Sequence, residues 1–196
     1  MKEGMTTILE TERLILRPWK DEDAPQLYEL CKDPDIGPRA GWPPHKDVQE
    51  SLEIIRTTLN DPLTFAICLK GEPEPLGAIS LMETHLENPE KQKAKEMGFW
   101  IGKPYWGNGY VVEAGNRLID YGFEKLNLDA VWCAHYVGNE KSKRAQEKLG
   151  YTFFAERKNV PVPLLGEIRD LIENHMTRKQ WESLEQRSKI SETDKE

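Results

Sequence analysis

The stretch Trp100–Glu113, WIGKPYWGNGYVVE, places a Gly-Asn-Gly triplet between an aromatic, β-like run and an amphipathic segment. The first-turn N–H groups of a helix have no acceptor within the helix, and together with the helix dipole they can bind a phosphate. Gly107 and Gly109 would permit the unusual dihedrals and the close approach that a phosphate cradle needs. Taken alone, the triplet favours a plain strand-to-helix turn, so both interpretations stay open at this point.

Two familiar nucleotide-binding patterns are absent from the chain. The motif G-x-x-x-x-G-K-[ST] does not occur, and the dinucleotide fingerprint fails because Val112 occupies the third glycine position. A nucleoside triphosphate or NAD is therefore not expected. A second strand-to-helix junction follows at Asn139–Ser142, and if the two junctions lie side by side they could flank one elongated ligand. Capping of the second helix is the alternative role for Asn139 and Ser142.

Composition excludes several functional classes. The 196 residues include 34 acidic and 27 basic side chains, a net charge of −7, so no broad positive field is available to attract nucleic acid or anionic lipid. The N-terminus lacks a secretory signal and no apolar run is long enough to span a membrane, which predicts a cytoplasmic protein. The three cysteines, at 31, 68 and 133, show no C-x-x-C pairing, so neither a disulfide framework nor a metal site is expected.

The pattern of apolar residues predicts a mixed α+β fold. Four segments have helical spacing: one begins at Asp21, and the others cover Asp47–Leu59, Tyr110 to about Lys125, and Glu140–Leu149. The runs typical of strands are Glu10–Arg17, Leu63–Leu69, Leu76–Met82, Met97–Ile101, Ala130–Tyr136, Tyr151–Ala155 and Ile168–Met176. The proline-rich segment Asp33–His45 is predicted to be irregular. We expect one domain over residues 1–183 and a polar tail over 184–196.

Four motifs in sequence order carry a resemblance to a known family. They are T-E-R-L-x-L-R-P at Thr11–Pro18, E-M-G-F-W-I at Glu96–Ile101, W-G-N-G-Y-x-x-E-A at Trp106–Ala114, and N-x-x-S-x-x-x-x-x-K-L-G-Y at Asn139–Tyr151. Together they resemble the GCN5-related N-acetyltransferase (GNAT) superfamily and its RimJ/RimL-like branch, the ribosomal-protein N-terminal acetyltransferases. The resemblance implies a mostly antiparallel central sheet of about seven strands flanked by about four helices.

The resemblance also implies a site for acetyl-CoA as co-substrate. Backbone N–H groups of Trp106–Tyr110 would hold the pyrophosphate, and Phe99–Ile101 would pair with the pantetheine amides like an added strand. Asn139 and Ser142 would face the pantetheine and thiol end. Family members often carry Gln or Arg where this chain has Pro104, so the resemblance implies the backbone cradle without that side-chain contact. The expected cofactor-binding residues are Phe99, Trp100, Ile101, Trp106, Gly107, Asn108, Gly109, Tyr110, Asn139 and Ser142.

Catalysis in this superfamily usually proceeds by direct transfer of the acetyl group, which implies a base for the amine and an acid for the leaving thiolate. Glu96 is the predicted base, with a solvated surface charge as its alternative role. Many superfamily members place a Tyr acid where this chain has Gln146, so Ser142 is the predicted acid, as it is thought to be in the ribosomal-protein branch. Reserve candidates for acid–base work are Glu83, His135, Glu173 and His175.

The acceptor side is less defined. By resemblance, Asp33–His45 with Trp42 and His45, the segment Asn159–Glu167, and Glu83 would contribute to substrate binding. The favoured acceptor is a protein or peptide N-terminal α-amine, with a small-molecule amine as the other option. A non-catalytic acyl-CoA-binding regulatory module is the alternative function, and a structural domain that uses the glycines only for turns is the third. Exposed sheet edges in such a fold are compatible with a homodimer.

Overall fold

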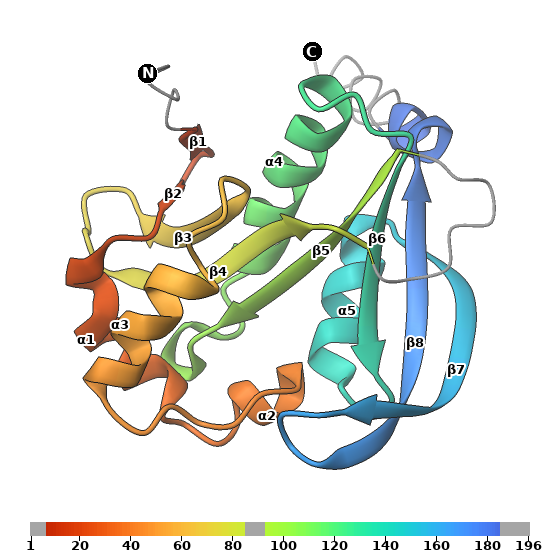
Figure 1. The fold of residues 1–196 in the computed structure, drawn as a ribbon. Helices are drawn as coiled ribbons and strands as arrows, with labels where there is room; N and C mark the ends of the chain where they lie inside the picture. Colours follow the sequence, from red (N-terminus) through yellow and green to blue (C-terminus); the bar gives the residue numbers. More distant parts are fainter. Residues whose placement is uncertain (1–6, 85–92, 185–196) are drawn as a thin grey trace.

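The computed structural model describes residues 7–84 and 93–184. Within these ranges one mixed sheet has the strand order β1-β2-β3-β4-β5-β6-β8-β7. Figure 1 shows the sheet with helices on both of its faces. The strands are β1 (Leu9–Glu10), β2 (Leu14–Pro18), β3 (Thr64–Leu69), β4 (Pro75–Met82), β5 (Ala94–Ile101), β6 (Ala130–Tyr136), β7 (Thr152–Val162) and β8 (Glu167–Thr177).

Helices connect the strands and cover the sheet. The α-helices are α1 (Ala24–Cys31), α2 (Gly37–Ala40), α3 (Val48–Thr57), α4 (Tyr110–Glu124) and α5 (Glu140–Leu149), and residues 178–184 form a further helical segment. Two short 3-10 helices, η1 (Asp21–Asp23) and η2 (Lys103–Tyr105), precede α1 and α4 respectively. In the described part of the chain, no helix is long and apolar enough to cross a membrane.

The pairing of β5 with β6 determines where a site can form. All other neighbouring strands pair antiparallel, whereas β5 and β6 run parallel and pair only from Ala94↔Ala130 to Glu96↔Trp132. Beyond Glu96 the two strands diverge, as Figure 1 shows, while β5 stays paired with β4 as far as Ile101. The edge of β5 that faces β6 is therefore unpaired over its last five residues.

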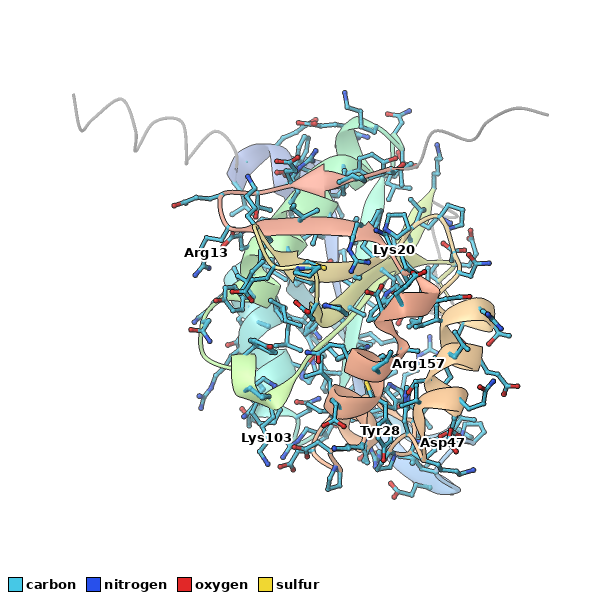
Figure 2. The ribbon with its side chains drawn as sticks, turned by 90° about the vertical axis from the view of Figure 1, so that its left-hand side faces the viewer. Arg13, Lys20, Tyr28, Asp47, Lys103 and Arg157 are labelled. Atoms are coloured by element: carbon cyan, nitrogen blue, oxygen red, sulfur yellow. The ribbon has the colours of Figure 1, made fainter. Side chains whose placement is uncertain are left out.

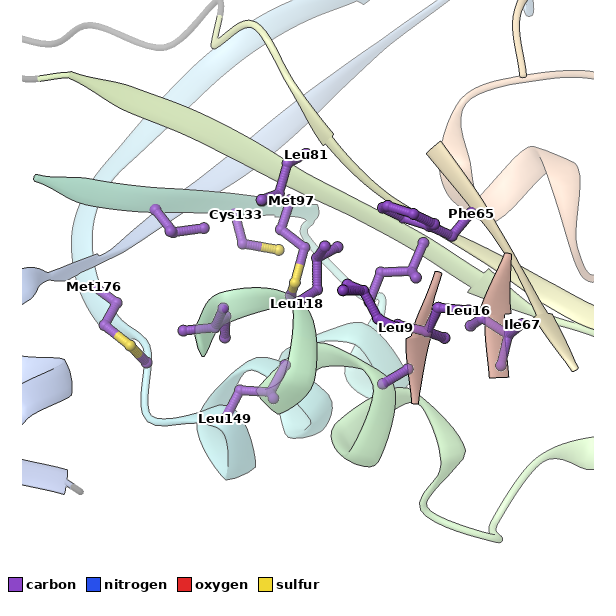
Figure 3. Packing of buried hydrophobic residues seen from close by; sticks show 14 of the residues in the cluster. Leu9, Leu16, Phe65, Ile67, Leu81, Met97, Leu118, Cys133, Leu149 and Met176 are labelled. Atoms are coloured by element: carbon purple, nitrogen blue, oxygen red, sulfur yellow. The ribbon is translucent and has the colours of Figure 1, made fainter. Parts of the chain in front are cut away.

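Two apolar clusters hold the layers together. The larger packs α4 and α5 against one face of the sheet and includes Met97, Leu118 and Leu149, each almost fully buried (Figure 3). The smaller packs α1 and α3 against the other face through residues such as Leu27 and Ile55. Burial of this apolar surface is the main favourable contribution to folding. It fixes the diverging strands between rigid helical layers.

The prediction of an α+β fold with a mostly antiparallel sheet is confirmed, and two of its elements, Ala130–Tyr136 and Glu140–Leu149, have the predicted bounds. The prediction was about seven strands and about four helices; the described residues form eight strands and six α-helical segments. One predicted strand divides into β1 and β2 because the Oγ1 of Thr11 accepts from the Leu14 N–H at 2.8 Å and closes a turn. Of the predicted tail, residues 185–196 lie outside the described residues.

Two loops predicted near the acceptor side also differ. The segment Asp33–His45 contains the one-turn helix α2, which has proline in its first turn and ends at Gly41 with a φ of +98°. Asn159–Glu167 is mainly strand, because β7 continues to Val162 and pairs with β8 in a long hairpin. Neither segment is a plain irregular loop.

Candidate active site

A cleft of about 760 Å³ opens where β5 and β6 diverge. One wall is β5 from Glu96 to Ile101, and the other is the end of β6 together with α5. The turn before α4 closes one end. Of the predicted site residues, those that line this cleft are Glu96, Phe99, Trp100, Ile101, Trp106, Gly107, Gly109, Tyr110, Asn139 and Ser142.

The N-terminus of α4 presents free backbone donors at this cleft. Its N-cap residue is Gly109, which has no side chain that could accept a hydrogen bond from the first turn. Gly107 and Gly109 have φ values of +82° and +78°, which L side chains rarely adopt, and a Cβ on Gly107 would meet nothing within 4 Å. The glycines thus form a turn and also leave the helix end open. This geometry fits an anion such as pyrophosphate.

The carboxylate of Glu113 joins the start of α4 to the turn between β1 and β2. The Oε1 of Glu113 accepts from the Thr11 hydroxyl at 2.6 Å and from the Arg13 N–H at 2.9 Å, and Oε2 accepts from Arg13 Nε at 2.7 Å. Arg13 also donates to the carbonyl of Asn108 at 3.1 Å. Burial raises the pKa of Glu113, but these hydrogen bonds outweigh it and lower the pKa below its ordinary value. Glu113 is therefore ionised and orders the cradle.

Asn108 is the one predicted cofactor residue that is outside the described lining of the cleft. Its Nδ2 donates to the carbonyls of Tyr105 at 3.0 Å and Trp106 at 3.3 Å. The side chain therefore stabilises the turn. On the strand wall, the carbonyl of Ile101 accepts from Trp106 Nε1 at 2.8 Å. Within the predicted Phe99–Ile101 edge, the Ile101 carbonyl therefore already accepts a hydrogen bond. A strand-like pairing with the pantetheine would have to use the backbone groups of the residues before Ile101.

Polar side chains on α5 face β6 at the other wall. Asn139 caps α5, because its Oδ1 accepts from the Ser142 N–H at 3.3 Å, and its Nδ2 donates to the Arg39 carbonyl at 3.3 Å. Ser142 is half-buried and its hydroxyl bonds with Gln146 Nε2 at 3.1 Å. Gln146 is 1% exposed and was not predicted to have a role.

A basic stripe beside the cradle was missed by the sequence prediction. Lys141, Arg144 and Lys148 are three and four residues apart on α5 and all line the cleft, together with Arg39 from α2. The Nζ of Lys141 lies 3.2 Å from the centre of the Trp106 ring. The signal was present as a cationic face in the α5 sequence. This local charge contrasts with the net charge of −7 and suits an anionic ligand.

The two predicted catalytic residues line the same cleft from different walls. Glu96 is half-buried on β5 and Ser142 begins α5. Cys133 also lines the cleft, but burial raises the pKa of its thiol well above the ordinary value, so the thiol stays protonated. Tyr151 is buried in the core with its hydroxyl 3.8 Å from Met97 Sδ. Neither Cys133 nor Tyr151 offers a reactive group.

Comparison with known proteins identifies the family. The family model for the acetyltransferase (GNAT) domain matches residues 13–152, which include the turn before α4, the β5 wall, the β6 and α5 wall, and the Arg13–Glu113 pair. The chain belongs to the GNAT acetyltransferase family. The predicted resemblance is thereby confirmed, and the protein is an acetyl-CoA-dependent acetyltransferase.

Two similar sequences and one similar solved structure show which proteins this GNAT protein resembles. A Bacillus licheniformis protein, the uncharacterized N-acetyltransferase p20, is 33% identical over 63% of this chain and 70% of its own. The Bacillus subtilis "Putative ribosomal N-acetyltransferase YdaF" is 34% identical over 54% of this chain and 55% of its own. The solved structure of the microcin C7 self immunity acetyltransferase MccE in complex with acetyl-CoA and AMP has a TM-score of 0.67. It is 20% identical over 85% of this chain and 93% of that chain, which shows the fold alone.

The cleft of this GNAT acetyltransferase fits acetyl-CoA in its chemistry. The open α4 terminus would bind the pyrophosphate, and the cations of α5 would face the phosphates of the nucleotide end. The unpaired edge of β5 would receive the pantetheine amides. Among residues 7–84 and 93–184, no group of three His, Cys, Asp or Glu side chains could hold a metal ion.

The predicted acceptor residues lie elsewhere. Trp42 packs against Trp100, with ring centres 6.2 Å apart, and is outside the described cleft lining. His45 is buried and its Nδ1 bonds with Ser51 Oγ at 2.8 Å. Glu83 is exposed and pairs with Lys95. Trp42 packs on Trp100, which lines the cleft, whereas the contacts of His45 and Glu83 are structural or at the surface.

Most of the reserve acid–base candidates are outside the described lining of the cleft. His135 lines the cleft but is buried, and burial lowers its pKa, so it is neutral near pH 7. Glu173 is fully buried and pairs with Arg157. His175 packs on Trp132 with ring centres 5.2 Å apart. Of the reserve residues, His135 alone belongs to the described lining of the cleft.

Proposed function

We propose that this enzyme transfers the acetyl group of acetyl-CoA directly to a primary amine, with a protein or peptide N-terminal α-amine as the favoured acceptor. The observation that carries the proposal is the placement of Glu96 and Ser142 on facing walls of one cleft whose end is the open α4 terminus. A carboxylate and a hydroxyl on either side of a thioester supply a base and a hydrogen-bond donor.

Glu96 takes the base role in this proposal. Its carboxylate is half-buried on β5 at the last paired position before the strands diverge. There it would accept the proton that the amine loses as the C–N bond forms, directly or through water. Much of the rate would come from holding the amine and thioester together between the two walls.

Ser142 takes the acid side. Its hydroxyl would donate a hydrogen bond to the sulfur as the C–S bond breaks, which stabilises the developing thiolate. The amine gives up one proton and the sulfur gains one, so the products are the amide and the CoA thiol. A covalent acetyl-enzyme is not part of this scheme, because the raised pKa of Cys133 keeps that thiol protonated.

As an acceptor for a carboxylate base, an N-terminal α-amine is better suited than the side-chain amine of a lysine. With ordinary pKa values, about one in seven α-amines is neutral at pH 7, against roughly four in ten thousand lysine side chains. A weak base such as Glu96 is matched to the amine that is more often neutral. The similarity to a relative whose name includes ribosomal N-acetyltransferase supports the same preference.

The test is an acceptor panel read by release of the CoA thiol and by product mass. One peptide has a free N-terminus and no lysine, and its matched control has an acetylated N-terminus and one lysine. Spermidine and aminoglycosides represent small amines. We expect turnover with the free N-terminus and less than a tenth of that rate with the blocked peptide. Turnover with small amines alone would exclude the N-terminal preference while keeping acetyl transfer.

A non-catalytic acyl-CoA-binding module is the other candidate. The feature in its favour was Gln146 in place of a Tyr acid, but Gln146 hydrogen-bonds to Ser142. Acetyl-CoA binding without turnover of any amine in the panel would favour this candidate.

A further inference from the structure

Gln146 has a fixed amide orientation beneath Ser142. Its Nε2 lies 3.0 Å from the backbone carbonyl oxygen of Ala134, which can only accept a hydrogen bond, so this end of the amide must be the NH₂. Its Oε1 accepts from Asn174 Nδ2 at 2.6 Å. His135 Nδ1 lies 3.4 Å from the same oxygen. A flipped amide would place two oxygens in contact at Ala134, so the assignment follows from the network.

This orientation dictates the direction of the bond to Ser142. The second Nε2 hydrogen points at Ser142 Oγ, 3.1 Å away, so the hydroxyl oxygen accepts. A serine hydroxyl has one proton to donate, and within the described part of the chain Oγ has no other hydrogen-bond partner. The Ser142 proton is therefore available on the side that lines the cleft.

We propose that Gln146 is a positioning residue that holds the Ser142 hydroxyl as an acceptor and so directs its proton to the leaving sulfur of acetyl-CoA. This inference rests on the proposed acid role of Ser142. Asn174 and His135, both 8% exposed, hold Gln146 from its other end. Buried polar groups that satisfy one another in this way keep a single arrangement. Gln146 acts only through Ser142 and does not touch the thioester.

The decisive variant is Gln146→Glu, which keeps the size but offers Ser142 an acceptor in place of the NH₂ donor. The carboxyl group would carry its proton toward the Ala134 carbonyl oxygen and would accept from the Ser142 hydroxyl, which would then turn away from the sulfur. We expect kcat to fall about tenfold to a hundredfold, the cost of one hydrogen bond to a charged group, while the KM for acetyl-CoA changes less than twofold. Gln146→Met, which is uncharged and has no donor, gives a second variant should Gln146→Glu fail to fold.

A double-mutant cycle separates this inference from the proposal on which it rests. Gln146→Glu and Gln146→Met are each combined with Ser142→Ala, with Glu147→Gln on the exposed side of α5 as the matched control and thermal unfolding as the check on folding. We expect either Gln146 variant to add less than a twofold loss of kcat once Ser142 is absent. If Ser142→Ala lowers kcat and a Gln146 variant lowers it further by its full single-variant factor, the positioning role is overturned. If Ser142→Ala keeps full kcat, the acid role itself is wrong.

Discussion

Arg13 Nε donates to Glu113 Oε2 at 2.7 Å and so joins the turn between β1 and β2 to the first turn of α4 across 100 positions of sequence. The same guanidinium donates to the Asn108 carbonyl and lies over the Tyr110 ring, 4.8 Å from its centre. Arg13 is at the sheet edge that faces the viewer in Figure 2. The motif residues Thr11 and Arg13 therefore brace the proposed phosphate cradle from outside the cleft.

Removing this brace should weaken acetyl-CoA binding. Glu113→Gln keeps the shape but loses the charge, so the turn at Gly107–Gly109 becomes looser. We expect the KM for acetyl-CoA to rise about fivefold to thirtyfold with kcat changed less than threefold. Glu124→Gln at the other end of α4 is the control. An unchanged KM in Glu113→Gln would show that the cradle holds without the clamp.

The basic stripe of α5 should act on the nucleotide end of the donor. Arg144→Glu is expected to raise the KM for acetyl-CoA about threefold to tenfold at low salt, and less as salt screens the exposed charge. Acetyl-pantetheine lacks the phosphates, so its KM should not change. Lys143→Glu, an exposed neighbour outside the described lining of the cleft, is the matched control. Equal effects on both donors would contradict this assignment.

Glu96→Gln tests the base. The amide cannot take a proton from the amine, so kcat should fall about a hundredfold or more, while acetyl-CoA binding is kept. Stopped assays over pH 6 to 9 provide the measurement. Glu83→Gln on the neighbouring strand end is the control, because Glu83 is exposed and pairs with Lys95. A Glu96→Gln enzyme with more than half of the wild-type kcat would move the base to another residue.

Two buried histidines should make stability fall below neutral pH. Burial lowers the pKa of His45 and of His135, so both favour the neutral form in the folded protein. Their contribution is complete above the unfolded pKa of about 6.5 and is lost as pH falls below it, because the unfolded state takes up protons first. The urea midpoint should therefore drop from pH 7 to 5.5. A double variant His45→Gln, His135→Gln should flatten this slope, and an unchanged slope would contradict the account.

Helices and strands could be predicted from the sequence where short motifs, such as helix caps, mark their ends. Glu140–Leu149 has its cap at Asn139 and its left-handed end at Gly150, so both bounds followed from short patterns. The helix α2 could not be predicted in this way, because a four-residue segment with proline in its first turn has the sequence pattern of a loop. It is held by tertiary contacts, such as the 2.5 Å bond from Arg169 Nη1 to the Pro38 carbonyl. No pattern within the segment encodes a contact made 131 residues away.

The candidate site also has some features that sequence motifs predict and others that only the folded structure shows. The cradle glycines and Asn139–Ser142 were found from motifs, since backbone geometry restricts which residues can occupy those positions. The partners of Glu113, the bonds of Gln146 and the direction in which the α5 cations face depend on how distant elements pack. Asn108 had the right position but its side chain closes the turn. The sequence thus predicted which segments form the proposed donor site, whereas the orientation of their side chains required the fold.

The most direct measurement compares CoA thiol release by the wild-type enzyme and by a Gly107→Val, Gly109→Val double variant, with the free N-terminal peptide as acceptor. Valine is strained at the positive φ of both positions and so would distort the cradle. We expect acceptor-dependent release by the wild type and a loss of at least a hundredfold in kcat/KM for acetyl-CoA in a variant that still folds, judged by circular dichroism. A folded variant with wild-type kcat/KM would contradict the assignment of this turn as the acetyl-CoA site.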